Sequence, residues 1–419
     1  MTSKEPKAEA IKVIQKKLLG KRLNYREVYT LMDEIAHERI SDVLTTYFVA
    51  ASFKEGFSPD ELYYLTKAMV ETGTKLDFKG IVADKHSTGG VAGTRTTMIL
   101  VPIIASAGFL IPKTSSRAIT SPAGTADVME VLASVTFTPE KIRKIVTKTG
   151  GCIVWGGKLG IAPADDVIID VEEELSFESF DKIIVSIMAK KVAVSTNHLV
   201  LDIPVGPTMK IQHPADGEKV AAKFQSLGKK FGMKIVAYVN DVREPAGCGV
   251  GPLLEAQDVM HVLEQKKDRP FALEKKTIVL AGKLLDICYK DAKINRSGEE
   301  EALKILQSGK ALKKFREIVK AQGGDDQVSC ESLKIKSHKF EIDAHKKGSI
   351  KKVNNYNMNM VAKVLGAPAD QEAGIFLRKK IGDHVDKNET MLVFYSSDKH
   401  RLEEARVTFE HFPIYEIES

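Results

Sequence analysis

Apolar residues recur along the first part of the chain at the spacing of amphipathic helices. They fall every three to four positions in residues 28–37 and 42–53, and this period is the main sequence signal for a helix that buries one face. Gly56 and Gly73 stand where the ends of such helices favour a left-handed backbone. The sequence therefore predicts a run of helices over residues 10–73.

Two short patterns predict where helices in this segment begin. Asn24 is followed three positions later by Glu27, and Ser58 is followed in the same way by Glu61. In a capping box, the first side chain accepts a hydrogen bond from the backbone three residues on, and the acid accepts one in return. We therefore expect helices that start directly after Asn24 and after Ser58.

From about residue 80 the pattern changes to short β-branched runs separated by helical stretches. Strands that alternate with helices form βα units, and these units build a largely parallel sheet that is buried on both faces. The expected fold class is therefore α/β, with ligands bound beyond the carboxyl ends of the strands. The expected strands are Ile81–Asp84, Phe109–Pro112, Cys152–Trp155, Leu199–Val205 and Lys234–Val239.

The overall composition excludes several classes of protein. The 419 residues include 62 Lys and Arg against 56 Asp and Glu, and the net charge of +6 is too small to indicate a nucleic-acid partner. The length predicts two or three domains. The polar start and the short apolar runs argue against a signal peptide and a membrane span. We therefore expect a cytoplasmic protein with no nucleic-acid or membrane partner.

Two loops rich in Gly, Ser, Thr and cations bracket one apolar segment. The first loop is DKHSTGGVAG (residues 84–93), the second is KTSSRAITSPAGTAD (residues 113–127), and the apolar run between them is residues 96–111. Glycines let the backbone approach an oxyanion, hydroxyls donate hydrogen bonds, and cations add charge. Two such loops around one segment predict a phosphate site.

These motifs resemble those of a known enzyme family. DKHSTGG is the signature of the thymidine and pyrimidine-nucleoside phosphorylases. The second loop and the stretch Gly150–Ile169 (GGCIVWGGKLGIAPADDVII) are similar to the AMP phosphorylase branch of that family. The resemblance extends from about Ala10 to the end of the chain. It implies a small all-α domain, a large α/β domain with a mostly parallel central sheet, and a C-terminal α+β domain.

The resemblance also implies a division into domains. A helical domain in residues 1–78 is completed by about 170–196, the α/β domain takes 79–169 and 197–331, and the C-terminal domain takes 332–419. Archaeal-type AMP phosphorylases carry a further N-terminal domain associated with large multimers, and this sequence begins where that domain would end. We therefore expect a plain homodimer.

The activity implied by the resemblance is phosphorolysis of nucleoside 5′-monophosphates, AMP first, with CMP and UMP as further candidates. Inorganic phosphate would be the co-substrate, and the products would be the free base and ribose 1,5-bisphosphate. Lysine offers a point charge to phosphate, hydroxyls donate hydrogen bonds, and glycine allows close backbone approach. The implied phosphate-binding residues are Lys85, Ser87, Gly89, Thr97 and Thr125.

A second set of residues is implied for the nucleotide. Arg117 is the natural bidentate partner of its phosphate, because a guanidinium matches the geometry of an oxyanion. Ser186 and Lys190 lie four positions apart, so one face of a helix presents both. The implied substrate-binding residues are Gly90, Ser116, Arg117, Ala118, Ile119, Thr120, Ser121, Thr125, Ser186, Lys190 and Lys210.

Two catalytic residues are implied, and one of them departs from the family pattern. His86 matches the family histidine beside the phosphate. Glu178 stands where the family has an Asp that protonates the departing base, and it keeps the acid on a side chain one methylene longer. Asp170 replaces a family Arg and is followed by the acids of residues 172–174. This acidic patch either faces solvent or indicates a different substrate.

No organic cofactor and no metal is indicated, because no His, Cys or Asp cluster has the spacing of metal ligands. Some pyrimidine phosphorylases hold a monovalent cation, and Glu255 in VGPLLEA matches the Glu that they use, so such an ion stays an alternative. The cysteines at 152, 248, 288 and 330 form no CxxC pair, which is typical of buried thiols in a reducing cytosol.

Three other functions stay open. A nucleoside phosphorylase of the thymidine or uridine type would share the phosphate loop and need no pocket for a 5′-phosphate. An anthranilate-type phosphoribosyltransferase has a related second loop but needs a pyrophosphate donor and magnesium-binding acids. A catalytically silent nucleotide-binding protein would account for the departures at Asp170 and Glu178.

Overall fold

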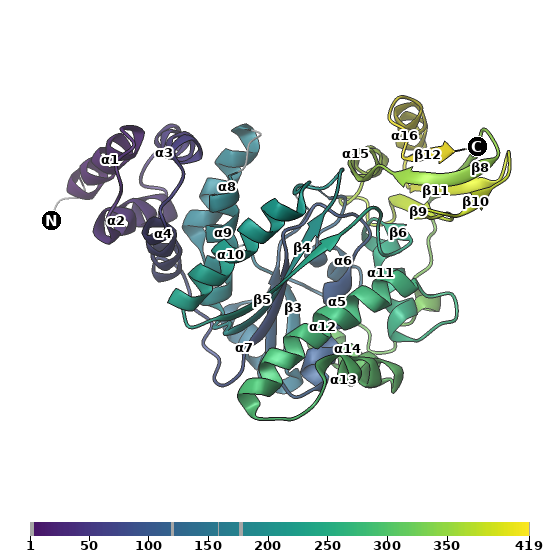
Figure 1. Cartoon of the computed structure of the whole chain (residues 1–419), viewed down its shortest axis with the longest axis horizontal. Helices are drawn as coiled ribbons and strands as arrows, with labels where there is room; N and C mark the ends of the chain where they lie inside the picture. Colours follow the sequence, from purple (N-terminus) through teal and green to yellow (C-terminus); the bar gives the residue numbers. More distant parts are fainter. Residues whose placement is uncertain (1–3, 119–120, 158, 176–178, 419) are drawn as a thin grey trace. The chain divides into compact units, whose positions relative to one another are not determined.

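The protein is described by a computed structural model that covers residues 4–118, 121–157, 159–175 and 179–418. The chain divides into two compact units, which can be followed by sequence colour in Figure 1. The first unit comprises Met1–Val82, Gly156–Leu199 and Val220–Ile235, and the second comprises Ala83–Trp155, Val200–Lys219 and Val236–Ser419.

The first unit is helical, as the apolar period predicts. Its helices are α1 (Lys4–Leu18), α2 (Tyr25–Ala36), α3 (Asp42–Glu55), α4 (Pro59–Glu71), α8 (Pro163–Leu175), α9 (Phe180–Ala193) and most of α10 (Pro214–Lys230). Both capping boxes form, Asn24 with Glu27 and Ser58 with Glu61, so the two predicted helix starts are confirmed. Within this unit α2 packs on α1, α4 and α8, and α4 also packs on α9.

The two glycines predicted as left-handed helix ends behave differently. Gly56 follows α3 with a φ of 66°, as predicted. The prediction for Gly73 is wrong, because Thr72 caps α4 and Gly73 has no positive φ. A Cβ on Gly73 would lie 2.8 Å from the Gly160 carbonyl oxygen. The glycine is therefore needed for the close approach of two backbone segments.

The second unit begins with alternating strands and helices. Its elements to residue 321 are β1 (Ala83–Ser87), α5 (Thr96–Ser106), β2 (Ile111–Ser115), α6 (Thr125–Glu130), α7 (Pro139–Thr149), β3 (Gly151–Trp155), most of β4 (His198–Val205) and β5 (Lys234–Asp241), β6 (Gly249–Val250), α11 (Pro252–Leu263), α12 (Phe271–Ala292), α13 (Gly298–Gln307) and α14 (Lys310–Ala321). Helices α12, α13 and α14 all contact α5 and gather beside it in Figure 1.

The strands confirm the predicted α/β class. β2 and β3 are parallel, with Ile111 opposite Gly151 and Ser115 opposite Trp155, and β1, β4 and β5 are neighbours in that order. Every predicted strand overlaps an observed one. β1 and β2 each end three residues later than predicted, at Ser87 and Ser115. These extensions carry the first residues of both predicted phosphate loops.

The rest of the second unit is an α+β region, as expected. It contains η1 (Cys330–Ser332), β7 (His338–Asp343), β8 (Gly348–Val353), α15 (Asn355–Leu365), β9 (Gly374–Leu377), β10 (His384–Val385), β11 (Thr390–Ser396), α16 (Lys399–His411) and β12 (Tyr415–Glu418). The strands form two antiparallel sheets, ordered β6-β9-β11-β7 and β10-β8-β12. Buried apolar side chains such as Met358, Ile375 and Phe394 form one core with α15.

Two expectations about the whole chain can be compared with the structure. Within the described ranges, none of the helices combines the length and apolar character needed to cross a membrane. The four cysteines are free thiols, of which Cys152 and Cys288 are buried.

Candidate active site

The first glycine-rich loop is built on the end of β1. Successive side chains of a strand point to opposite faces, so Lys85 and Ser87 share one face and His86 lies on the other. Gly89 and Gly90 follow with φ angles of 85° and 88°, a left-handed conformation that favours glycine. The Gly89 N–H donates to Ser87 Oγ across 3.4 Å. The loop thus begins with an ammonium group and a hydroxyl on the same side of one short strand.

Gly90 is the point where another predicted residue approaches this loop. A Cβ on Gly90 would lie 3.3 Å from Lys210 Cγ, so a side chain there would crowd that lysine. Asn355 anchors the loop by donating to the Gly90 carbonyl and by accepting from the Ala92 N–H at 3.0 Å. The structure therefore brings together two of the residues that the resemblance implies for the nucleotide.

Arg95, the N-cap of α5, joins the first loop to the second. Its Nη1 donates to Thr125 Oγ1 at 3.0 Å, and its Nη2 donates to the Ala123 carbonyl at 2.8 Å. Its Nε also donates to Glu255 Oε2 at 2.9 Å. Thr97 follows in the first turn of α5. Because Arg95 follows the first loop by two residues and bonds to Thr125 and Ala123, it links the end of the first loop to the second loop.

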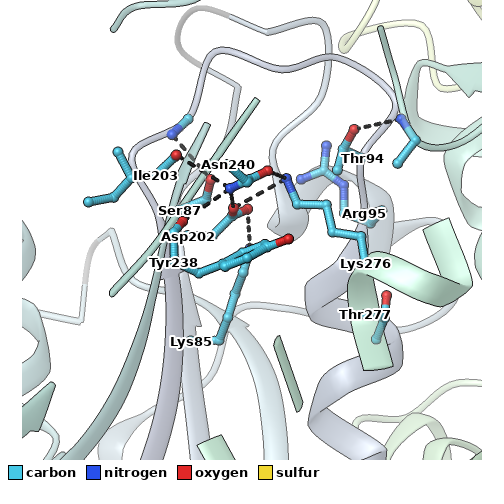
Figure 2. Close-up of polar contacts among 12 residues, drawn as sticks. Lys85, Ser87, Thr94, Arg95, Asp202, Ile203, Tyr238, Asn240, Lys276 and Thr277 are labelled. Atoms are coloured by element: carbon cyan, nitrogen blue, oxygen red, sulfur yellow. Dashed lines mark hydrogen bonds and ion pairs between the residues drawn. The ribbon is translucent and has the colours of Figure 1, made fainter. Parts of the chain in front are cut away.

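Lys85 belongs to a buried charged cluster around Asp202, which Figure 2 shows. Asp202 Oδ2 lies 3.8 Å from Lys85 Nζ, while Asp202 Oδ1 lies 3.2 Å from Lys276 Nζ. Asn240 Nδ2 donates to the same Oδ1 at 2.9 Å. Burial, assisted by the charges of Lys276 and Arg95, lowers the pKa of Lys85 to about 8 despite the nearby carboxylate. A small change in charge nearby will therefore change the protonation of Lys85.

A second buried lysine fixes the strand that carries Lys85. Lys113 on β2 places its Nζ 3.2 Å from Asp84 Oδ1 and donates to the Lys85 carbonyl at 2.9 Å. The side chains of Lys113 and Asp84 are both buried. Lys113 therefore joins β2 to β1 at the start of the first loop.

The second loop is organised by Asp127 in the first turn of α6. Its Oδ2 accepts from the Ala118 N–H at 2.7 Å and from the Gly124 N–H at 2.8 Å. Ser116 and Ser121 belong to this loop, where Ser116 is exposed and Ser121 is half-buried. One aspartate thus fixes the backbone that carries the predicted hydroxyls.

Arg117 is engaged within the protein. Its Nη1 and Nη2 bond to the Glu130 carboxylate at 2.6 and 2.7 Å, and Nη1 also lies 3.0 Å from Asp127 Oδ1. The guanidinium carbon lies 4.9 Å from the centre of the Trp155 ring. Hydrogen bonds to Glu130, with help from Asp127, raise the pKa of Arg117 further above its usual range. A phosphate that binds Arg117 would therefore compete with the Glu130 carboxylate for these donors.

In the first unit, the side chains predicted to contact substrate converge on Asp165. Ser186 Oγ donates to Asp165 Oδ2 at 2.6 Å, and Lys190 Nζ lies 2.9 Å from the same oxygen. Lys182, one turn earlier on α9, donates to Asp165 Oδ1 at 2.6 Å. Burial favours the protonated form, but Lys182 and Lys190 hold the pKa of Asp165 far below its usual range. The carboxylate is therefore charged and fully hydrogen-bonded.

The acidic segment that departs from the family pattern is divided between solvent and this cluster. Asp170 and Glu174 are exposed, which agrees with the solvent-facing alternative for these two residues. Glu172 is half-buried, and its Oε2 lies 3.8 Å from Lys182 Nζ. A lysine of α9 thus stands beside the acids of α8.

Three predicted residues lie outside the described part of the chain. They are Ile119, Thr120 and Glu178.

Among the described residues, the acidic and thiol groups close enough to share a metal ion are those of Glu264, Cys330 and Glu331. Lys266 already pairs with Glu331 and lies 3.6 Å from Glu264 Oε2. Burial and the Glu264 hydrogen bond raise the pKa of Cys330 to about 12, so its thiol stays protonated. Glu255, which the resemblance links to a monovalent cation, is bound by the Arg95 guanidinium.

Sequence reasoning missed the aspartates at the centre of both lysine clusters. Lys182 could have been found, because it precedes Ser186 and Lys190 by four and eight positions on one helix face. Asp202 and Lys276 lie in segments that are distant in the sequence, and their spacing carries no signal.

Comparison with protein families assigns all three parts of this architecture. The profile described as "Glycosyl transferase family, a/b domain" matches residues 79–312, and "Glycosyl transferase family, helical bundle domain" matches residues 11–73. "Pyrimidine nucleoside phosphorylase C-terminal domain" matches residues 349–412. A glycosyl transferase built from these three domains is the class that the fold defines.

Individual relatives make the assignment narrower. AMP phosphorylase 1 of Archaeoglobus fulgidus is 39% identical over 401 residues, which cover 96% of this chain and 79% of the relative. AMP phosphorylase of Methanococcus maripaludis is 41% identical over 94% of this chain and 78% of its own. A putative thymidine phosphorylase of Bradyrhizobium diazoefficiens is 42% identical over 93% of this chain and 75% of its own. The chain therefore belongs to the glycosyl transferase family that contains these phosphorylases.

A solved structure supports the fold alone. Anthranilate phosphoribosyltransferase from Thermus thermophilus superimposes with a TM-score of 0.61 and covers 74% of this chain and 99% of its own. Its sequence identity is 18%, so the likeness carries no conclusion about substrate.

Proposed function

We propose that this protein is an AMP phosphorylase, which uses inorganic phosphate to cleave nucleoside 5′-monophosphates. The observation that carries the proposal is the bridge formed by Arg95 between the two phosphate loops. The hydrogen bond from Arg95 links Thr125 to the segment that follows the loop carrying Lys85 and Ser87. The relatives named AMP phosphorylase, at 39% and 41% identity over most of the chain, support the same substrate.

The chemistry is a displacement at the ribose. A phosphate oxygen forms a bond to C1′ while the bond between C1′ and the base nitrogen breaks, and the base leaves with a proton. Lys85, Ser87 and Thr125 would hold the attacking phosphate with charge-assisted and hydroxyl hydrogen bonds. Glu178 would supply the proton, with His86 beside the phosphate. The products are the free base and ribose 1,5-bisphosphate, and no cofactor takes part.

Lys210 and the second loop would bind the 5′-phosphate. The close approach of Lys210 to Gly90 supports this role, because the stem of that flexible side chain lies beside the first loop. Arg117 would contribute when the nucleotide phosphate replaces Glu130. Ser186 and Lys190 would contact the base, with Asp165 holding both side chains in place.

Base release separates this function from its alternatives. The protein is incubated with AMP, CMP, UMP and the matching nucleosides, with and without phosphate, and the free base is measured. Phosphate-dependent release from nucleotides alone supports the proposal. Release from nucleosides alone supports the second candidate, and no release from any substrate rules out both.

A nucleoside phosphorylase is the second candidate. The engagement of Arg117 by Glu130 and Asp127 favours it, because a nucleoside needs no cation at that position. The putative thymidine phosphorylase at 42% identity is consistent with the same function.

We also propose a cytoplasmic homodimer. Val43 and Tyr47, one turn apart on α3, are 65% and 54% exposed, and apolar side chains of this kind suit a subunit interface. Sedimentation equilibrium of the full chain tests the dimer. The predicted domain boundaries, with a C-terminal domain from residue 332, are proposals that limited proteolysis tests.

A further inference from the structure

The ammonium groups of Lys85 and Lys276 share one carboxylate, that of Asp202. Lys276 comes from α12, Asp202 from β4 and Lys85 from β1, and their side chains are 12%, 3% and 5% exposed. Lys85, which is buried, and Lys276, which is half-buried, therefore share one carboxylate as their ion-pair partner. A buried charge without a full complement of counter-charge is costly unless a ligand supplies it.

The two oxygens of Asp202 are used unequally. Oδ1 accepts from Asn240 Nδ2 at 2.9 Å and lies 3.2 Å from Lys276 Nζ. Lys276 Nζ also donates to Asn240 Oδ1 at 3.1 Å, so lysine, amide and carboxylate form a closed triangle. Lys85 Nζ lies 3.8 Å from Oδ2, beyond hydrogen-bonding distance. Figure 2 shows this triangle on one side of Asp202 and Lys85 on the other.

The neighbouring cations have carboxylates beside them. Arg95 is paired with Glu255 at 2.7 Å, and Lys113 lies 3.2 Å from Asp84. The charges that act on Lys85 are therefore those of Asp84 on its own strand, Asp202 on β4, Arg95 at the start of α5 and Lys276 on α12, with the Tyr238 hydroxyl on β5 nearby in Figure 2. Of these groups, Lys276 is the one that also pairs with Asp202, the main counter-ion of Lys85.

We propose that Lys276 is a positioning residue for phosphate binding, which engages Asp202 so that this carboxylate does not neutralise Lys85. Without Lys276, Asp202 can turn toward Lys85 and form a direct ion pair. Inorganic phosphate would then have to compete with a carboxylate for the same ammonium. The proposal rests on the phosphate role of Lys85 in the proposed function.

Phosphate binding and turnover test this role separately. Titration calorimetry with inorganic phosphate is performed on the full chain and on Lys276→Gln, Lys276→Met and Lys276→Arg. Lys275→Gln is the matched control, because Lys275 is the exposed neighbour on the same helix. We expect the dissociation constant for phosphate to rise about tenfold in the Gln and Met variants, as for one unit of pKa shift from a nearby charge. Arg should restore most of the affinity, and the control should not change it.

The pH profile gives a readout that a purely structural role would not move. Lys276 lowers the pKa of Lys85, so its removal should raise that pKa. The pH above which phosphate affinity declines should move upward by about one unit in Lys276→Gln. In turnover, KM for phosphate should rise about tenfold, with kcat and KM for the nucleotide within about threefold of wild type.

The possible results separate the role of Lys276 from the proposed function. The role of Lys276 would be overturned by an unchanged phosphate affinity or by an unchanged pH at which that affinity declines. Effects of equal size on kcat and on both KM values would overturn it as well. If Lys276→Met unfolds, Lys276→Gln can still hydrogen-bond Asn240 and is compared with Lys276→Arg. A wild type that binds phosphate but releases no base rejects the proposed function and leaves this test intact. A wild type that binds no phosphate rejects both.

Discussion

Two buried aspartates, one in each unit, are each shared by two lysines, and they differ in how completely they are paired. Asp165 in the first unit receives Lys182, Ser186 and Lys190 at 2.6 to 2.9 Å. Asp202 in the second unit has Lys276 at 3.2 Å and Lys85 at 3.8 Å. All three donors of the first cluster lie within hydrogen-bonding distance of Asp165. In the second cluster, Lys85 has no direct hydrogen bond to Asp202.

The pKa values show the consequence of this difference. Despite burial, Asp165 and Asp166 raise the pKa of Lys190, so the first cluster holds its charges firmly. Burial instead lowers the pKa of Lys85 to about 8. Further acids, Asp166 and Glu172, lie near the first cluster and further cations lie near the second. The first cluster is suited to holding two helices together and the second to attracting an anion.

The largest effect should follow removal of the first carboxylate. Asp165→Asn leaves the buried Lys182 and the half-buried Lys190 without their main counter-charge, and breaking a buried pair costs about 3–5 kcal/mol. The free energy of unfolding, measured in urea, should fall by that amount. Asp202→Asn should cost less, because Lys85 can lose its proton. Asp166→Asn is the matched control, since its carboxylate is 38% exposed and 3.7 Å from Lys190. Equal losses at Asp165 and Asp202 would remove the distinction between the clusters.

The next effect concerns the second cluster, around Asp202. Lys85→Ala should lower phosphate-dependent base release about 100- to 1,000-fold, as for removal of one preorganised charge at a reaction centre. The free energy of unfolding should change little, because the variant removes a buried ammonium whose pairing is incomplete. Lys275→Ala serves as the control on the same unit. A Lys85→Ala variant that unfolds readily and keeps its turnover would reverse the roles assigned to the two clusters.

The two clusters should also differ in how their effects depend on pH. Lys85 is protonated below its pKa of about 8, so phosphate affinity should fall as the pH rises through that value. The lowered pKa of Asp165 means that its contribution to stability is present above the ordinary value of 3.8 and lost only in stronger acid. The raised pKa of Lys190 means that its contribution is present below 10.5 and lost above it. The stability lost in Asp165→Asn should therefore stay constant between about pH 5 and 9, whereas calorimetric phosphate affinity should not.

The smallest effect is expected at Arg117, a cation that is already paired with carboxylates, as the lysines of the first cluster are. Arg117→Ala should reduce turnover of AMP about tenfold and that of adenosine less, because exchange with Glu130 limits what the guanidinium contributes to phosphate binding. The ratio of kcat/KM values for the two substrates measures this. Glu130→Gln should shift the ratio toward the nucleotide by weakening the competing pair. Equal losses on both substrates in Arg117→Ala would remove its role at the 5′-phosphate.

Local features of this protein followed directly from the sequence. The helices after Asn24 and Ser58 and the strands that lead into both loops depend on neighbours within a few residues. Such patterns are readable because backbone geometry repeats over short distances. The same reasoning failed at Gly73, where the constraint comes from the distant Gly160 backbone.

The pairing of charges was decided by tertiary structure alone. The sequence supplied a lysine at 85 and an arginine at 117, but folding placed Glu130 on the arginine and left Asp202 incompletely bonded to the lysine. Coulomb energies depend on separation and burial, and neither can be read from spacing along the chain. The sequence therefore determined which elements form and which side chains they carry, while the packing of α12 and β4 decided which cation is left to meet an anion.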